Sequence, residues 1–236
     1  MNLNVMLYRA TVFICLWAFA GADVNAAVYS TIQQGAFDQT EIWSPQYPGN
    51  IIKENDTLLI SHEIRLNADL LVKGTLIIEE SASLIGLHNV IVVRTGTVIN
   101  LGNMQVDLFT NRGAFYNRQH LEVITDFVNS GNIINHKDIT VSNVIDNTGI
   151  MLGKGGSITA TNKFINSRTG QIKGYLNVCS NNFLNVEGGV IDTQTTTFCG
   201  NPVLGDQGLL SQAQETLQYK RNVTVVHLRT GEYKPF

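Results

Sequence analysis

The sequence predicts an all-β fold, a right-handed parallel β-helix with about 18 residues per coil. The first observation is a repeat: the pattern Phe-x-Asn-x-Gly-x-apolar begins at Phe109, at Phe127 and, with isoleucine in first place, at Ile145. Both intervals are 18 residues, and looser copies begin at Phe164 and Phe183. A fixed period of this length is the signature of a stacked fold in which each repeat contacts its neighbours.

The second observation is the alternation inside each copy. Phe109, Asn111, Gly113 and Phe115 lie two positions apart, so they share one side of an extended strand. A further alternating pair precedes each anchor, so each coil contains at least two short strands. With a rise of about 3.3 Å per residue such strands close a small coil, and parallel crossover connections are overwhelmingly right-handed.

Stacking of the copies predicts two internal columns. The apolar column contains the anchors Phe109, Phe127, Ile145, Phe164 and Phe183. The polar column contains Asn111, Asn129, Asn147, Asn166 and Asn185. Asparagine tolerates turn geometry, and stacked amides bond from one coil to the next. We interpret the asparagines as a structural ladder, with a ligand-binding row as the alternative.

Residues 1–26 are predicted to be a cleaved signal peptide, which makes the mature protein secreted or cell-surface. Arg9 supplies the positive charge, residues 10–20 form an apolar core too short to span a bilayer, and Ala26 precedes a plausible cleavage point. An uncleaved membrane anchor is the alternative. The mature chain has no further apolar segment of spanning length, so we expect no transmembrane segment in it.

Three segments are expected to follow the signal peptide: an entry segment and N-terminal cap at 27–50, the β-helix at 51–201, and a C-terminal cap and tail at 202–236. Trp43 is expected to cover the open end, because an uncovered strand edge pairs with other chains. Stacking of Trp43 on a sugar is the alternative. Past Pro202 the repeat ends, helical spacing predicts a short helix over 206–219, and strand character returns over 222–228.

Composition excludes several function classes. The formal net charge of −3 excludes a strongly basic nucleic-acid binder, so no nucleic acid is expected as a partner. The five histidines show no metal-ligand spacing and no phosphate-binding loop occurs, so no metal and no cofactor are expected. Cys179 and Cys199 lie about one coil apart, and in an oxidising compartment they are predicted to form a disulfide. Free buried thiols are the alternative.

The first coils contain a set of motifs that resemble a known family. They are Trp43-Ser-Pro45, Asn55-Asp-Thr-Leu-Leu-Ile60, Glu63-Ile-Arg-Leu66, Leu71-Val-Lys-Gly-Thr-Leu-Ile-Ile78 and Ala82-x-Leu-Ile-Gly86. This stretch resembles the opening of the extracellular eight-glycine β-helical domain family and is similar to secreted bacterial β-helix repeat proteins. Asn55 stands where that family usually has glycine. The resemblance implies an extracellular setting and contact with glycans, and it implies no catalytic residue.

A row of basic residues is the candidate binding site. Arg118, His136, Lys154 and Lys173 each lie nine positions after an anchor, and the first three also keep the same distance from the repeat glycine. If the register holds, they form a row along one edge that could follow an acidic polysaccharide. A β-helix lyase similarly uses Lys, Arg or His as a base and to neutralise a uronate. The alternative is a set of solvated turn residues.

The leading functional prediction is a secreted or cell-surface solenoid with a structural, adhesive or glycan-binding role and no catalysis. The acids Asp107, Asp126, Asp138 and Asp146 stand at different distances from their anchors, so they are not expected to converge on one cleft. The alternative function is a polysaccharide lyase or glycoside hydrolase of the β-helix type acting on acidic polysaccharide. Ice binding needs an outward threonine row, and the sequence contains too few threonines in register.

Overall fold

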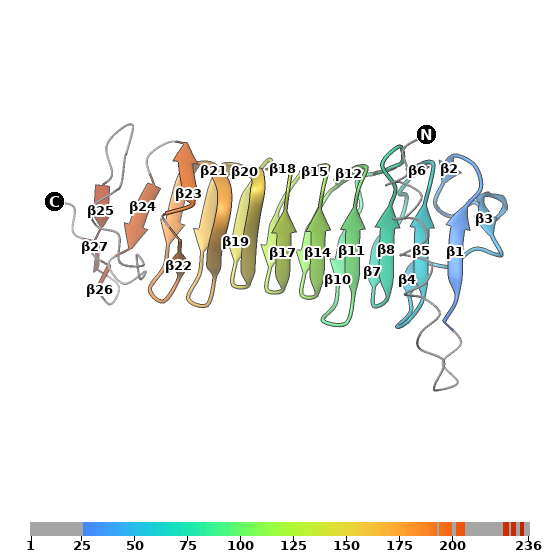
Figure 1. Ribbon diagram of the computed structural model, residues 1–236, viewed down its shortest axis with the longest axis horizontal. Coiled ribbons are helices and arrows are strands. Elements are labelled where there is room, and N and C mark those ends of the chain that lie inside the picture. Colours follow the sequence, from blue (N-terminus) through green and yellow to red (C-terminus); the bar gives the residue numbers. More distant parts are fainter. Residues whose placement is uncertain are drawn as a thin grey trace, which may run out of the picture.

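The computed structural model describes residues 26–192 and 194–199, together with strand segments at 202–205, 224–226, 228–229 and 232–233. The signal peptide expected at 1–26 lies outside the described residues except for Ala26, and so does the helix expected at 206–219. The described chain is an elongated stack of parallel coils (Figure 1). The predicted β-solenoid is confirmed, with about eight turns that lie about 19 residues apart.

Each coil contributes one strand to each of three faces. Face 1 contains β4 (Ile51–Ile52), β7 (Leu70–Val72), β10 (Val90–Val92), β13 (Phe109–Asn111), β16 (Phe127–Asn129), β19 (Val144–Asn147), β24 (Pro202–Gly205) and β25 (Thr224–Val226). Face 2 contains β1 (Val28–Thr31), β5 (Thr57–Ile60), β8 (Thr75–Ile78), β11 (Thr97–Asn100), β14 (Ala114–Asn117), β17 (Asn132–Asn135) and β22 (Val190–Ile191). Face 3 contains β2 (Gly35–Ala36), β6 (Glu63–Arg65), β9 (Ser83–Ile85), β12 (Asn103–Val106), β15 (His120–Val123), β18 (Asp138–Val141) and β23 (Thr196–Cys199).

Two long strands, β20 (Ile150–Asn166) and β21 (Gln171–Asn185), run through all three faces. We name the turns after the faces that they connect, so the chain passes the 1–2 edge, the 2–3 edge and the 3–1 edge in every coil. The 1–2 edge lies at the bottom of Figure 1 and the 2–3 edge at the top. Beyond the stack, β26 (Leu228–Arg229) and β27 (Glu232–Tyr233) pair antiparallel, and β25 and β26 overlap the expected strand at 222–228.

The repeat anchors form the core, because each lies directly opposite its counterpart in the next coil. All five are buried, and the ring centroids of Phe109 and Phe127 are 5.1 Å apart, as are those of Phe164 and Phe183. Ile145 separates the two aromatic pairs. Burial of each anchor stabilises the fold by about 1.5–3 kcal/mol.

The five predicted asparagines form a ladder at the 1–2 edge, and all are buried. The Nδ2 of each donates to the Oδ1 of the next, over 2.7–2.8 Å, from Asn111 through to Asn185. Such amide bonds satisfy polar groups that would otherwise be costly to bury. The structural interpretation of this row is therefore confirmed, and burial leaves its amides inaccessible to a ligand.

A second ladder, which we did not predict, lies at the 2–3 edge. Asn100 donates to Asn117 and Asn117 donates to Asn135, both over 2.9 Å, and all three are buried. Its sequence signal is an apolar-x-Asn pattern at the end of β11, β14 and β17, the same pattern that ends β13, β16 and β19 of face 1. The turns that follow these six strands therefore each begin at a buried asparagine of a ladder.

The N-terminal end of the stack is closed, as predicted for Trp43. β3 (Trp43–Ser44) pairs antiparallel with the free edge of β1, after a short 3-10 turn (Thr40–Ile42). Trp43 is only 4% exposed, packs edge-on against Phe37 and donates from Nε1 to the Phe37 carbonyl oxygen over 2.9 Å. This burial leaves no open ring face for a sugar. Stacking also begins before residue 51, because β1 and β2 already pair in parallel with β5 and β6.

The disulfide between Cys179 and Cys199 is confirmed. The two residues are direct partners on β21 and β23, and their Cα atoms are 4.7 Å apart. Adjacent parallel strands place in-register residues within disulfide reach. The bond therefore links two successive coils on face 3.

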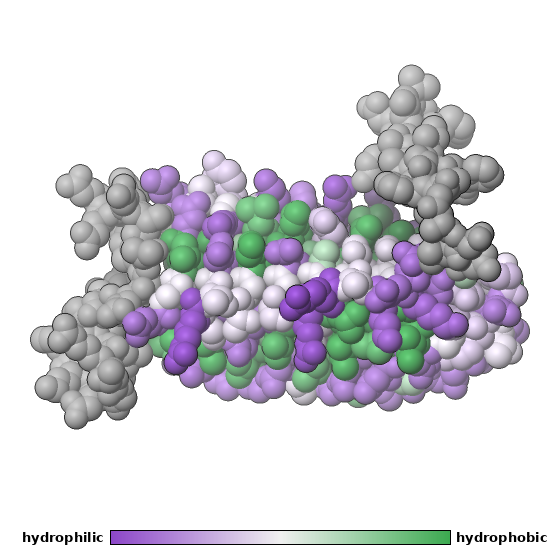
Figure 2. Space-filling model, turned by 90° about the horizontal axis from the view of Figure 1, so that it is seen from below, coloured by the Kyte–Doolittle hydropathy of each residue, from purple (hydrophilic) through white to green (hydrophobic). Residues whose placement is uncertain are grey.

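The three faces differ in their outward side chains. On face 2 one of the two outward columns is apolar or aromatic from β5 to β20: Leu59, Ile77, Ile99, Tyr116, Ile134 and Leu152. On face 3 the equivalent column is mostly charged or polar, with Arg65, Gln105 and Glu122, although Ile85 lies between the first two. Seen from the 1–2 edge, apolar patches lie on both sides of a pale band of weakly polar residues (Figure 2).

Candidate functional site

Three of the four predicted basic residues form a row on the 2–3 edge. Asn117 is the direct partner of Asn135, and Asn135 is the partner of Gly153. The residues that follow, Arg118, His136 and Lys154, therefore occupy the same position in three successive coils. Arg118 and Lys154 are exposed and His136 is half-buried. We call these three residues the basic row.

Lys173 does not belong to the basic row, so this part of the prediction needs correction. Lys173 is the partner of Leu152 on face 2, and the residue opposite Lys154 is Tyr175. The cause is the turn at 167–170, which contains four residues where the two preceding coils have two. Counting nine residues from the anchor therefore reaches a position two residues too early. Tyr175 is 69% exposed and continues the row with an aromatic ring.

The electrostatics of the basic row show that its members affect one another. Burial lowers the pKa of His136, and the positive charges of Arg118 and Lys154 lower it further. Near neutral pH His136 is thus uncharged between two cations. Within residues 26–192 and 194–199 no ion pair involves any of the three side chains. The charges of Arg118 and Lys154 are therefore available to an anionic ligand.

Three of the four aspartates considered for catalysis accept hydrogen bonds from different side chains. In each case the donor lies in the following coil: Asn143 donates to Asp126 over 2.8 Å, Ser157 to Asp138 over 2.7 Å, and Ser167 to Asp146 over 2.8 Å. These acids lie at the start of face 1, the start of face 3 and the middle of face 1. Each one links two coils, and no two of them share a hydrogen-bonding partner among the described residues.

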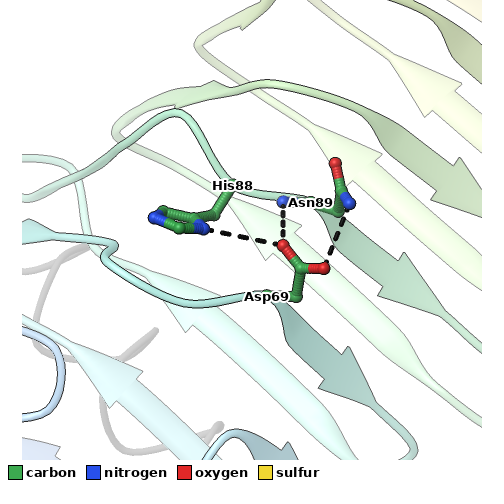
Figure 3. A network of polar contacts seen from close by, with 3 residues as sticks. All are labelled: Asp69, His88 and Asn89. Carbon is green, nitrogen blue, oxygen red and sulfur yellow. Dashed lines mark hydrogen bonds and ion pairs between the residues drawn. The ribbon is translucent and has the colours of Figure 1, made fainter.

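The 3–1 edge has a polar network of its own (Figure 3). Asp69 accepts hydrogen bonds from the backbone N–H and the Nδ2 of Asn89, over 2.9 and 3.1 Å, and Nδ1 of His88 lies 3.6 Å from its Oδ1. The side chains of His88 and Asp69 are both well exposed, so their contact contributes little stability. The network fixes one turn to the next. Among the described residues no group of three or more side chains is arranged to hold a metal ion.

Comparisons with known proteins give no relative: no family model, no curated protein and no solved structure matches the chain. Among the described residues, no helix has the length and apolar character needed to cross a membrane.

Proposed function

We propose that this protein is a secreted or cell-surface β-solenoid that binds acidic polysaccharide along the basic row and has no catalytic activity. The observation that carries the proposal is the register of Arg118, His136 and Lys154 in three successive coils. Coils in such a stack repeat every ~4.8 Å, so Arg118 and Lys154 present two positive charges about 10 Å apart, with the neutral imidazole of His136 between them. A linear polymer with regularly spaced carboxylates or sulfates is the matching ligand.

The surroundings of the basic row also fit a carbohydrate. Tyr116 and Tyr175 are 39% and 69% exposed, and each lies within two residues of the row in sequence or register. Aromatic rings offer a broad apolar surface with a polar tip, which suits the mixed faces of a sugar. Cationic groups without partners beside such rings attract the acidic substituents of the same chain.

Triple replacement of Arg118, His136 and Lys154 by alanine tests the proposal in the chain from residue 27 to residue 236. The wild-type protein is first screened on a glycan array at low salt, and each acidic ligand is then titrated with the variant. We expect binding to weaken on the order of tenfold to hundredfold, since each exposed charge contributes about 1 kcal/mol. The salt dependence should flatten as well.

The matched control is the double variant Lys163→Ala, Lys173→Ala. It removes the same formal charge at neutral pH from positions outside the basic row. Binding that is unchanged in the triple variant, or equally weakened in the control, would count against the basic row as the site.

The second candidate function is a polysaccharide lyase or glycoside hydrolase of the β-helix type. Its specific support is His136, whose lowered pKa keeps an imidazole base unprotonated between two cations that could neutralise a uronate. Each array ligand is therefore also assayed for new reducing ends and for unsaturated products. Turnover that disappears in His136→Ala would establish this candidate in place of the non-catalytic one.

A further inference from the structure

The 1–2 edge contains a saddle that arises from unequal turn lengths. Three successive turns, at 112–113, 130–131 and 148–149, contain two residues each. The turns on either side, at 93–96 and 167–170, contain four. The longer turns protrude beyond the shorter ones, so the three short turns form the floor of an open groove of about 800 Å³. This saddle lies along the pale band of Figure 2.

Glycines allow the coils to stack closely along the floor of the saddle. A Cβ added at Gly131 would overlap the carbonyl oxygen of Gly113, and one added at Gly149 would overlap that of Gly131. The coils therefore approach too closely here for a side chain in between. Gly96 and Gly170 of the long turns are equally crowded, so the glycines explain the close stacking and the difference in turn length explains the hollow.

The saddle carries positive charge at one end, where Arg94 of the first long turn and Arg112 of the first short turn line the groove. The second long turn repeats the sequence Arg-Thr-Gly, but Thr169 lines the groove there and Arg168 does not. Among the described residues none of these three arginines forms an ion pair. The groove lining contains no carboxylate; outside it, Glu54 accepts a hydrogen bond from the lining residue Thr95 over 3.4 Å.

The rest of the lining mixes small polar residues with the apolar residues Val93, Ala114 and Ile150. Its polar members include Ser130, Asn132 and Thr148, and the hydroxyl of Thr148 donates to the Asn129 carbonyl oxygen over 3.2 Å. The hydroxyl oxygen of Thr148, Oγ1, can still accept a hydrogen bond from a ligand. The Ser130 hydroxyl makes no hydrogen bond to another described residue. Hydroxyl and amide groups of this kind match the hydroxyls of a sugar chain.

We propose that the saddle is a second binding site for a linear acidic oligosaccharide, so that one protein molecule bridges two acidic polymer chains. The five turns span four coil intervals, about 19 Å in total, which suits a short run of sugar units. The basic row lies on a different edge, so the two binding sites do not compete for one polymer segment. The proposal of a binding site in the saddle depends only on the groove and its arginines, whereas the proposal of bridging also rests on the proposed function of the basic row.

Isothermal titration calorimetry with a galacturonate hexasaccharide tests whether the saddle binds an acidic oligosaccharide. We expect about two oligosaccharides bound per wild-type chain, and about one in each of two variants: Ser130→Glu, and the double variant Arg94→Ala, Arg112→Ala. Ser130→Glu places a carboxylate on the saddle floor at an exposed position whose side chain bonds no other described residue, so the fold should persist. The matched control, Arg65→Ala with Lys163→Ala, removes two cations elsewhere and should keep both sites. A neutral glucose hexasaccharide should bind at neither.

The outcomes separate the saddle from the basic row. Loss of one site in the saddle variants and of the other in the triple variant of the basic row supports both. Saddle variants that bind two hexasaccharides as tightly as the wild type overturn the saddle. A basic-row variant that still binds two overturns the proposed function instead.

Bridging has its own readout. Long polygalacturonate mixed with wild-type protein should form large particles in light scattering, with a maximum at intermediate protein concentration, because excess protein occupies every chain singly. Ser130→Glu should abolish the maximum. Particles that form equally with Ser130→Glu overturn the bridging.

Discussion

The 1–2 edge and the 2–3 edge are both stabilised by a ladder of buried asparagines, but the two ladders differ in length. At the 1–2 edge the asparagine ladder continues through five coils, across turns of two residues and of four. At the 2–3 edge it has three members and ends at Asn135, whose partner in the next coil is Gly153. There the Nδ2 of Asn135 turns instead to the backbone carbonyl oxygens of Lys137 and Ser157.

The difference shows what an asparagine at a strand end does. Asn129 and Asn166 both bond to the next coil, and each also donates within its own turn, to the carbonyl oxygens of Gly131 and Gly170. One side chain thus closes a turn of either length. Where glycine replaces it at 153, an extra residue enters the turn and the register shifts between Lys154 and Gly156. The basic row directly follows this ladder and keeps its register beyond the ladder's end, because Lys154 still pairs with Tyr175 before the shift.

Glycine replacement should produce the largest contrast between the two edges. Gly131→Ala places a methyl group against the backbone of the preceding coil, and we expect a loss of about 3 kcal/mol or more in unfolding free energy. Gly155→Ala at the 2–3 edge meets no atom within 4 Å, but the residue has φ of 100°. The strain there should cost about 1–2 kcal/mol. Urea unfolding midpoints measure both, and equal losses would contradict the assignment of a steric cause to one and a conformational cause to the other.

Ladder interruption should give an intermediate effect. Asn129→Ala removes the donor to Asn147 Oδ1 and one of two acceptors of Asn111 Nδ2, so we expect a loss of about 2–3 kcal/mol. Asn135→Ala should cost less, about 1 kcal/mol, because Gly153 follows it in the next coil and no buried side-chain amide oxygen loses its donor. Chemical denaturation of the two variants compares the edges directly. A larger loss for Asn135→Ala would show that position in the ladder does not set its contribution.

The titration of His136 should give the smallest effect. Its pKa is lowered in the folded protein, so between that pKa and the unfolded value near ~6.5 the unfolded chain binds more protons. Stability is therefore lost as the pH falls through this window and is fully present above it. Arg118→Ala should raise the pKa towards the ordinary value, and only in part, since burial is the larger cause. NMR titration of the ring protons measures the change, and bound acidic glycan should raise the same pKa.

Sequence periodicity was sufficient to predict the architecture, the apolar column and the first ladder, because each depends on residues at a constant spacing. The spacing also placed Arg118, His136 and Lys154 together. It misplaced Lys173 because register depends on the length of every intervening turn, and the four-residue turn at 167–170 shifts it by two. The saddle escaped prediction for the same reason, since it results from a difference in length between neighbouring turns. The second ladder was detectable, because Asn100, Asn117 and Asn135 repeat at nearly the period of the anchors.

The ladders have a direction, and the direction limits how such a stack begins. Every amide donates towards the C-terminal end, so the first member of each ladder keeps an oxygen without a donor, at Asn100 and at Asn111. An asparagine placed in the coil before would move the orphan oxygen without removing it. Each ladder thus carries one fixed cost of about 1–3 kcal/mol and a gain with each added coil. This is the logic of nucleation and propagation, in which the stack is harder to start than to lengthen. Homologous β-solenoids should therefore differ in the number of coils within a ladder more often than in the number of ladders.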